Sequence, residues 1–260
     1  MIFIGERINA GFKDIKAAIV NKDGDVIKEW ARKQADAKAT YLDVNLGTAS
    51  NKIDDLVWMI EQVQDEVDLP ISIDNNKPAF LREAIPACKR PPLINSVTAV
   101  EEQMNLLFPI VAEHGASIIG LVMDEEGSPK SAEKRVENAG KIVAKMMEYE
   151  LTPDQLFIDP IVMPVKFMQD QAKEILSATA QFKLFSDPPC HTVCGLSNIS
   201  NGTKHKKLIN RTFAVMMVAN GMDAVILDVM DKELMDAILT AEIIMDKSIY
   251  ADSYLQAFRR

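Results

Sequence analysis

The amino-acid sequence predicts a (β/α)8 TIM barrel that forms a single domain over residues 1–260. Short runs rich in β-branched residues alternate with longer amphipathic stretches, a pattern typical of parallel sheets with helical crossovers. The length suits such a barrel, which takes about 250 residues, and no linker or low-complexity tract divides the chain. An open doubly wound sheet is the alternative. That fold ordinarily has a Gly-x-Gly-x-x-Gly turn after its first strand, which Gly5 and Gly11 do not form.

The expected elements follow in order along the chain. Apolar, β-branched runs predict strands at residues 2–4, 41–44, 71–73, 93–94, 117–122, 156–158, 192–193 and 224–227. Amphipathic stretches predict helices at residues 26–38, 53–67, 78–88, 101–114, 132–149, 172–182, 206–219 and 232–245. Leu208, Thr212 and Val215 show the helical spacing in one of them. Asp54 and Asp55 lie near the start of another, where the helix dipole favours acids.

The composition excludes several classes of protein. Lys and Arg number 29 against 38 Asp and Glu, giving a net charge of −9, so the chain lacks the basic surface of a nucleic-acid-binding or polybasic membrane-binding protein. Its apolar runs are far shorter than the ~20 residues that span a bilayer. The first residues lack the basic region of a signal peptide. The odd number of cysteines, three, fits a reducing compartment, so we expect a cytoplasmic protein.

One stretch, Cys190-His191-Thr192-Val193-Cys194, contains three potential zinc ligands. If it runs into a strand, its two sulfurs are about 13 Å apart at ~3.3 Å per residue. Two ligands of one zinc ion are no more than about 4.6 Å apart. The sequence also lacks His-Glu-x-x-His and paired Cys-x-x-Cys motifs. We therefore expect no metal site, and we interpret the two cysteines as small buried hydrophobic residues.

Polar side chains follow nearly every expected strand, at the barrel face where active sites lie. In chain order these residues are Glu6, Arg7, Asn9, Asp43, Asn45, Asp74, Asn75, Asn76, Asn95, Ser96, Asp124, Asp159, Ser197, Asn198 and Asp228. A single Asp after a strand is commonly a turn former or a helix cap, and we assign Asp124 and Asp228 to that role. The set as a whole contains too many amides to be explained by caps, which indicates a ligand site.

Acids and amides together are suited to binding a flat heterocycle. A carboxylate accepts two parallel N–H bonds from an amino-pyrimidinone edge, and a carboxamide offers one donor and one acceptor. A pterin has such an edge, and Asp74, Asn95 and Asp159 come from three different strands that meet at one rim. We therefore predict that these three residues fix a pterin plane. A ligand without that edge would leave buried polar groups unpaired and would bind poorly.

Six short motifs then carry a family resemblance that covers essentially the whole chain. They are Gly-Glu-Arg-Ile-Asn at residues 5–9, Leu-Asp-Val-Asn at 42–45, Ser-Ile-Asp at 72–74, Ile-Asn-Ser at 94–96, Phe-Ile-Asp-Pro at 157–160 and Gly-Leu-Ser-Asn at 195–198. In this order they resemble the methyltetrahydrofolate:corrinoid protein methyltransferases, a group of pterin-binding methyltransferases. Ile-Asn-Arg-Thr-Phe at 209–213 and Gly-Met-Asp-Ala at 221–224 extend the likeness.

The resemblance implies a homodimeric barrel that moves a methyl group between N5 of tetrahydrofolate and the cobalt of a corrinoid (cobalamin). Folate is then a substrate. The sequence lacks the Asp-x-His-x-x-Gly corrinoid-binding motif, so a separate corrinoid protein is the implied partner.

The resemblance also implies roles for individual residues. By motif, Asn198 is the catalytic residue, hydrogen-bonded to N5. The implied folate-binding residues are Asp74, Asn95, Asp159, Gly195, Ser197 and Lys206, where Lys206 stands nearest the basic residue that follows the Gly-Leu-Ser-Asn turn in the family. Further rim contributions are expected from Glu6, Asn9, Asp43 and Asn45.

Two alternatives stay open at this point. Dihydropteroate synthase shares the barrel and the pterin site, but its basic Ser-Arg-Lys-like turn is replaced here by Ser197-Asn198-Ile199, and its late Arg-x-His motif is absent. A non-catalytic folate-binding protein would need the pterin site but not Asn198. The direction of transfer is not fixed either. The departure from the family pattern around Lys204, Lys206 and Lys207 slightly favours a demethylation role, with methyl-corrinoid as the donor.

Overall fold

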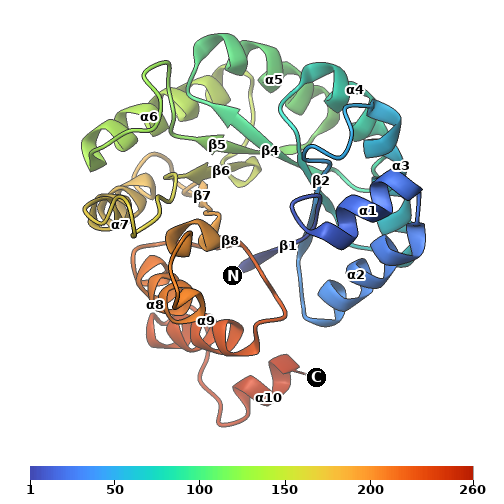
Figure 1. Ribbon diagram of the computed structural model, residues 1–260. Coiled ribbons are helices and arrows are strands. Elements are labelled where there is room, and N and C mark those ends of the chain that lie inside the picture. Colours follow the sequence, from blue (N-terminus) through green and yellow to red (C-terminus); the bar gives the residue numbers. More distant parts are fainter. Residues whose placement is uncertain (260) are drawn as a thin grey trace.

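Parallel strands form the wall of a barrel and helices form an outer ring around it (Figure 1). The computed structural model describes residues 1–259. Within them the strands are β1 (Ile2–Asn9), β2 (Tyr41–Asn45), β3 (Ile71–Asp74), β4 (Leu93–Thr98), β5 (Ser117–Leu121), β6 (Leu156–Asp159), β7 (His191–Thr192) and β8 (Ala224–Leu227). Their order in the sheet is β7-β6-β5-β4-β3-β2-β1-β8, and every recorded strand pair is parallel. The predicted (β/α)8 barrel is confirmed.

The barrel closes between β7 and β8 through only a few contacts. The backbone N–H of Ile226 donates to the carbonyl of Cys194 at 2.9 Å, and Gly195 and Ile226 form a parallel bridge. The N–H of Asp223 also donates to the carbonyl of Thr192 at 3.4 Å. The short β7 therefore leads into a turn that lies at the barrel rim, directly beside the end of β8.

The surrounding helices are α1 (Lys13–Asn21), α2 (Gly24–Asp36), α3 (Ile53–Glu66), α4 (Pro78–Ala87), α5 (Glu101–His114), α6 (Ala132–Glu148), α7 (Gln171–Phe182), α8 (Lys206–Ala219), α9 (Lys232–Ile244) and α10 (Tyr254–Arg259). Short 3-10 turns occur at η1 (Pro153–Gln155) and η2 (Leu196–Ser200). Helix α10 lies outside the ring, beyond α9 (Figure 1). Within residues 1–259, none of the helices is long and apolar enough to cross a membrane.

Four elements differ most from the sequence-based expectation. Strand β4 continues to Thr98 instead of ending at residue 94, beyond the polar pair Asn95 and Ser96. Strand β1 continues to Asn9 instead of ending at residue 4, because its polar second half still pairs with β2 through Ile8 and Asn9. Helix α1 was not predicted, although Ile15, Ala18 and Ile19 are buried at helical spacing along it. The helix has only 9 residues and follows closely after the polar end of β1, so its apolar spacing is a weak signal in the sequence. Helix α10 was not predicted either.

The positions of the polar site residues follow from two apolar layers, one inside the barrel and one between the strands and the helices. Inside the barrel, Ile4, Leu93, Ile119, Phe157, Val193 and Ala224 pack together as one cluster. A larger cluster fills the space between the strands and the helices. Because side chains alternate along a strand, the residue two positions beyond each interior residue faces inward again. Glu6 follows Ile4 in this way, Asn95 follows Leu93, and Asp159 follows Phe157. A polar layer therefore lies directly above the apolar interior, toward the carboxyl ends of the strands.

At the opposite end of the barrel, Asp223 ties β7 and β8 together. Its carboxylate accepts hydrogen bonds from the backbone N–H of Thr192 at 2.7 Å and from Lys183 Nζ at 2.5 Å, and His191 Nδ1 lies 3.4 Å away. Burial alone would raise the pKa of Asp223. The contacts with His191 and Lys183 outweigh burial and lower this pKa to about 2. The ionised carboxylate thus stabilises the folded barrel.

We expect Asp223→Asn to lower the free energy of unfolding by about 1–2 kcal/mol at pH 7, after allowing for solvent screening of this partly exposed group. A carboxylate with a lowered pKa contributes its full stabilisation above its unfolded pKa of about 3.9. That contribution is lost as the pH falls toward about 2. Urea titrations of both proteins at several pH values measure the difference. A difference that stays constant below pH 4 would contradict this assignment.

Candidate functional site

Asp43 lies at the centre of the polar layer. It is buried on β2 and accepts hydrogen bonds from Ser72 Oγ at 2.6 Å and from Asn95 Nδ2 at 3.2 Å. Burial raises the pKa of Asp43 to about 8, and the charge of Asp74 adds to this shift. Because the Nδ2 of Asn95 is committed to Asp43, the Oδ1 of Asn95 remains as an acceptor for a ligand.

Asp74 and Asn45 form the second pair. Asn45 Nδ2 donates to Asp74 Oδ2, while Asn45 Oδ1 accepts the backbone N–H of Gly47 at 2.5 Å. Both polar ends of Asn45 are therefore used within the protein, and Asp74 keeps its Oδ1 for a ligand. Burial raises the pKa of Asp74, and the hydrogen bond from Asn45 opposes that shift.

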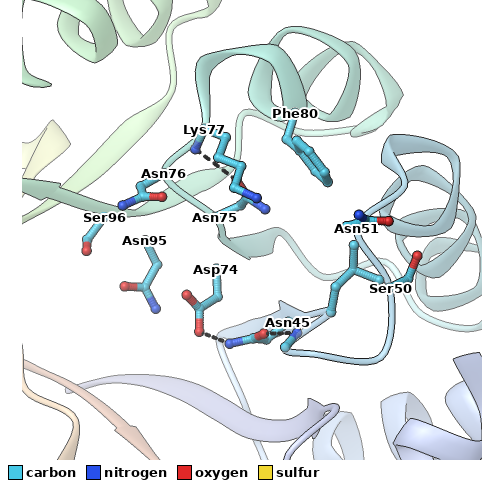
Figure 2. A pocket seen from close by; sticks show the side chains of 12 residues that line it. Asn45, Ser50, Asn51, Asp74, Asn75, Asn76, Lys77, Phe80, Asn95 and Ser96 are labelled. Carbon is cyan, nitrogen blue, oxygen red and sulfur yellow. Dashed lines mark hydrogen bonds between the residues drawn. The ribbon is translucent and has the colours of Figure 1, made fainter.

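These groups line a cavity of about 280 Å³ at the carboxyl ends of β2, β3 and β4 (Figure 2). The lining residues are Asn45, Leu46, Gly47, Ser50, Asn51, Asp74, Asn75, Asn76, Lys77, Phe80, Asn95 and Ser96. Asn45 and Asp74 are joined by their hydrogen bond, and Asn95 lies beside them. Lys77 Nζ lies 5.2 Å from the centre of the Phe80 ring. The cavity is at the small end of the range for ligand sites, a size suited to one bicyclic ring.

Asp159 faces the same interior from β6, outside the residues that line this cavity. It is buried, and its Oδ1 accepts the backbone N–H of Ile161 at 2.7 Å. Burial raises the pKa of Asp159 to about 7, although hydrogen bonds from the backbone of Ile161 and Gly195 oppose the shift. The contact with Gly195 links Asp159 to the turn that follows β7.

That turn, η2, carries Ser197 and Asn198. Asn198 is exposed on the rim, and its Oδ1 lies 3.4 Å from Asn201 Nδ2, which donates to it. Asn198 Nδ2 lies only 3.0 Å from the point that a Cβ on residue 195 would occupy. Gly195 therefore leaves room for the amide of Asn198, whose Nδ2 remains as a free donor. Ser197 Oγ lies 2.9 and 3.1 Å from the two carboxylate oxygens of Glu6.

The structure thus brings the predicted residues together in two groups. Asp74, Asn95, Asp43 and Asn45 form one around the cavity, and Glu6, Asp159, Gly195, Ser197 and Asn198 form the other around η2. The two groups interact electrostatically: the charge of Glu6, in the second group, contributes to the raised pKa of Asp43, in the first.

Two predicted residues lie apart from these groups. Asn9 Oδ1 accepts the backbone N–H of Gly11 at 2.8 Å, which is a local turn contact. Lys206 is exposed at the start of α8, in a separate hollow that is lined by residues 203–208. The turn roles assigned to Asp124 and Asp228 are confirmed, since they accept the backbone N–H groups of Glu126 and Met230, each at 3.0 Å.

Sequence reasoning missed several residues of the site. Ser72 supports Asp43, and its position two residues before Asp74 could have shown that both face the interior. Lys77 and Phe80 line the cavity from the loop after β3 and from α4. Lys77 directly follows the Asp74-Asn75-Asn76 run, so its position at the rim could also have been predicted from the sequence. Phe80 carries no such signal, because one aromatic residue on a helix is more often part of the core.

Both cysteines of the Cys190–Cys194 stretch are buried free thiols. Cys190 Sγ lies 3.4 Å from Ser186 Oγ, and Cys194 Sγ lies 3.4 Å from Met222 Sδ. Within residues 1–259, no three His, Cys, Asp or Glu side chains are grouped as a metal site would require.

A (β/α)8 barrel with acids and amides above its interior and a ring-sized cavity at its rim has the form of a heterocycle-binding enzyme. The sequence profile of the family described as pterin binding enzymes matches residues 5–228, and the chain belongs to this family. It is 34% identical over 265 residues to the methylcorrinoid:tetrahydrofolate methyltransferase of Eubacterium limosum, which covers 100% of this chain and 97% of that protein.

Other similarities are more distant. Methionine synthase of Mycobacterium tuberculosis is 26% identical over 240 residues, which cover 87% of this chain but only 20% of that protein. A solved dihydropteroate synthase from Coxiella burnetii, in complex with pteroic acid, superposes with a TM-score of 0.70 at 16% identity. The match covers 95% of this chain and 94% of that one. At this identity the likeness concerns the fold alone.

Proposed function

We propose that this chain is a methyltransferase that moves a methyl group between a methylated corrinoid, held by a separate corrinoid protein, and N5 of tetrahydrofolate. The full-length match to the Eubacterium limosum methyltransferase carries this proposal. The name of that relative also supports methyl-corrinoid as the donor and tetrahydrofolate as the acceptor, in agreement with the demethylation role favoured by the sequence.

The free acceptors of the site are suited to the pterin edge. Asp74 Oδ1 and Asn95 Oδ1 are left after the internal hydrogen bonds are counted. The carboxylate of Asp159, which is held by the backbone N–H groups of Ile161 and Gly195, faces the same interior as a third acceptor. A 2-amino-4-oxo-pyrimidine edge presents N–H groups, so three acceptors match it and would hold its plane. The 280 Å³ cavity suits the ring and leaves the rest of the folate to extend over the rim.

The chemistry needs no nucleophile from the protein. N5 is the nucleophile in one direction, and the reduced corrinoid is the nucleophile in the other. The protein has to hold donor and acceptor in line and to stabilise the changing charge on N5. Asn198 Nδ2 is a free donor on the exposed rim, where a hydrogen bond to N5 would favour the transition state over the ground state.

A direct assay tests the proposal. The purified chain is mixed with methyltetrahydrofolate and cob(I)alamin, or with methylcobalamin and tetrahydrofolate, and the cobalt absorbance is followed. We expect methyl transfer in both directions, since a catalyst lowers the barrier both ways. Folate binding without any absorbance change would instead identify a non-catalytic folate-binding protein. Repeating the assay with corrinoid proteins as substrates identifies the partner.

The proposal includes four further expectations. Residues 1–260 act as one pterin-binding barrel domain, the active form is a homodimer, the protein works in the cytoplasm, and it binds no nucleic acid. The homodimer follows from the family resemblance, and the three free cysteines support a reducing compartment. Light scattering of the purified protein tests the dimer.

A further inference from the structure

Glu6 and Ser197 link the first strand to the turn that carries Asn198. Ser197 Oγ lies 2.9 Å from one carboxylate oxygen of Glu6 and 3.1 Å from the other. Glu6 is partly buried near the end of β1, and Ser197 directly precedes Asn198. A carboxyl group and a hydroxyl group are therefore in contact beside the amide that is proposed to meet N5.

The proposed reaction requires a proton at that place. When N5 gives up its methyl group, the bonding electron pair stays on N5, which then takes a proton. In the other direction, N5 loses that proton as its electron pair forms the bond to the methyl group. Asn198 is a neutral amide, so it donates a hydrogen bond but supplies no proton.

We propose that Glu6 is the acid and base of the reaction and that Ser197 passes the proton between Glu6 and N5. This inference rests on the proposed function. As N5 accepts a methyl group, the N5–H bond breaks and its proton moves to Ser197 Oγ, while the Ser197 hydroxyl proton moves to the Glu6 carboxylate. The methyl group leaves the corrinoid without its bonding electrons, which remain on cobalt. In the reverse reaction, neutral Glu6 returns a proton through Ser197 to N5.

The Ser197 hydroxyl has a single proton, so the protonation state of Glu6 decides whether Ser197 accepts a proton from N5 or donates one to it. With Glu6 ionised, Ser197 donates to the carboxylate and is left as an acceptor for the proton of N5. With Glu6 neutral, Glu6 donates to Ser197, and the hydroxyl proton is free to turn toward N5. One pair of residues thus provides a base in one direction and an acid in the other.

The charges around Glu6 favour its neutral form. Burial raises the pKa of Glu6, the hydrogen bond from Ser197 opposes this shift, and the charge of Asp228 beyond β8 adds to it. Asp43 faces Glu6 from β2 and is itself raised to a pKa of about 8. The neighbouring Arg7 is directed away, because its guanidinium pairs with Asp14 at 2.7 Å and lies over the ring of Trp30. The pKa of Glu6 is thereby raised toward the range in which an acid–base catalyst works.

Glu6→Gln, Ser197→Ala and a control, Glu125→Gln in the exposed loop after β5, test the inference. Methyl transfer is measured against pH in both directions, and folate affinity is measured separately. In the wild type, transfer from methyltetrahydrofolate should slow as the pH rises through the pKa of Glu6, and transfer to tetrahydrofolate should speed up. Glu6→Gln and Ser197→Ala should each be at least tenfold slower in both directions, within the range of general acid–base catalysis.

The Glu6→Gln protein should also lose the part of the pH profile that Glu6 controls, while its folate affinity changes less than twofold. The control should match the wild type throughout. NMR of protein with 13C-labelled glutamate carboxyl groups supplies a readout without turnover. One resonance, absent from Glu6→Gln, should titrate with a pKa above the ordinary value for Glu.

Three results would overturn the inference. They are a Glu6→Gln enzyme with the rate and pH profile of the wild type, a slower Glu6→Gln enzyme whose loss appears equally in folate affinity, or a Glu6 resonance with an ordinary or lowered pKa. In each case an active wild type would leave the proposed function standing. A wild type that transfers no methyl group would refute the proposed function itself.

Discussion

Replacing Asn198 with Ala is expected to slow methyl transfer by at least tenfold while changing folate affinity far less. The Nδ2 of Asn198 is free because Asn201 donates to the Oδ1, and Gly195 leaves the space that this amide occupies. A donor that meets N5 as its charge changes acts on the transition state rather than on the bound substrate. If it contributes as much as an oxyanion-hole donor, about 2.7–4 kcal/mol, the loss reaches 10²–10³-fold.

The measurement is the rate with saturating folate, together with the dissociation constant of folate from titration. Asn105→Ala is a matched control, because Asn105 is exposed on α5, away from the rim turns. A loss of affinity with an unchanged rate at saturating folate would show that Asn198 binds folate but does not assist the reaction. An unchanged rate would remove Asn198 from the mechanism and would favour a different donor at N5.

The fold could be predicted because every strand and most helices have a recognisable local pattern of apolar residues. Buried strands such as Ile71–Asp74 are short apolar runs, and helices such as Ala132–Glu148 have a clear apolar stripe. The errors have two sources: α1 and α10 are short helices, and β1 and β4 continue past their apolar runs into polar residues. The second half of β1 is polar, and of its residues Glu6 joins the site, so the apolar run ends before the strand does.

The candidate site could be predicted only in part. Parallel strands bring their carboxyl ends together, so the positions of Asp74 and Asn95 at one cavity followed from topology. The direction in which each amide points did not follow, because it depends on partners from other strands. Asn95 presents an oxygen since Asp43 holds its nitrogen, and this contact spans 52 residues. The link between Glu6 and Ser197 spans 191 residues and has no local signal in the sequence.

Burial within this group of side chains also explains why the site contains acids with raised pKa values. Burial raises the pKa values of Asp43, Asp74 and Glu6, and the charges of Asp74 and Glu6 add to the shift of Asp43. A ligand that donates N–H groups to Asp74 or Asp159 favours their ionised forms. In the proposed binding mode, folate binding and proton uptake or release by these acids are linked, so the pH dependence of folate affinity is informative about individual residues.

Asp159→Asn is expected to weaken folate binding by about 10–100-fold, the effect of about 1–3 kcal/mol. In the proposed binding mode the carboxylate of Asp159 is the third acceptor for the pterin, and its Oδ1 also accepts the N–H of Ile161. An Asn side chain that keeps this bond turns its Nδ2 toward the ligand, where two donors then face each other. Titration of folate into both proteins measures the loss, with the exposed Asp25→Asn as the control.

The pH dependence of the same titration separates a lost acceptor from a general disturbance of the site. The pKa of Asp159 is raised to about 7 by burial, so in the wild type the carboxylate is increasingly protonated below that pH. A protonated carboxyl group is a poorer acceptor for N–H donors, so wild-type affinity should fall as the pH decreases through about 7. In Asp159→Asn this part of the pH dependence should disappear, while the contributions of Asp43 and Asp74 remain. If the variant kept the wild-type dependence, the carboxylate of Asp159 would not be what holds the pterin, and the three-acceptor arrangement would have to be assigned to other residues of the rim.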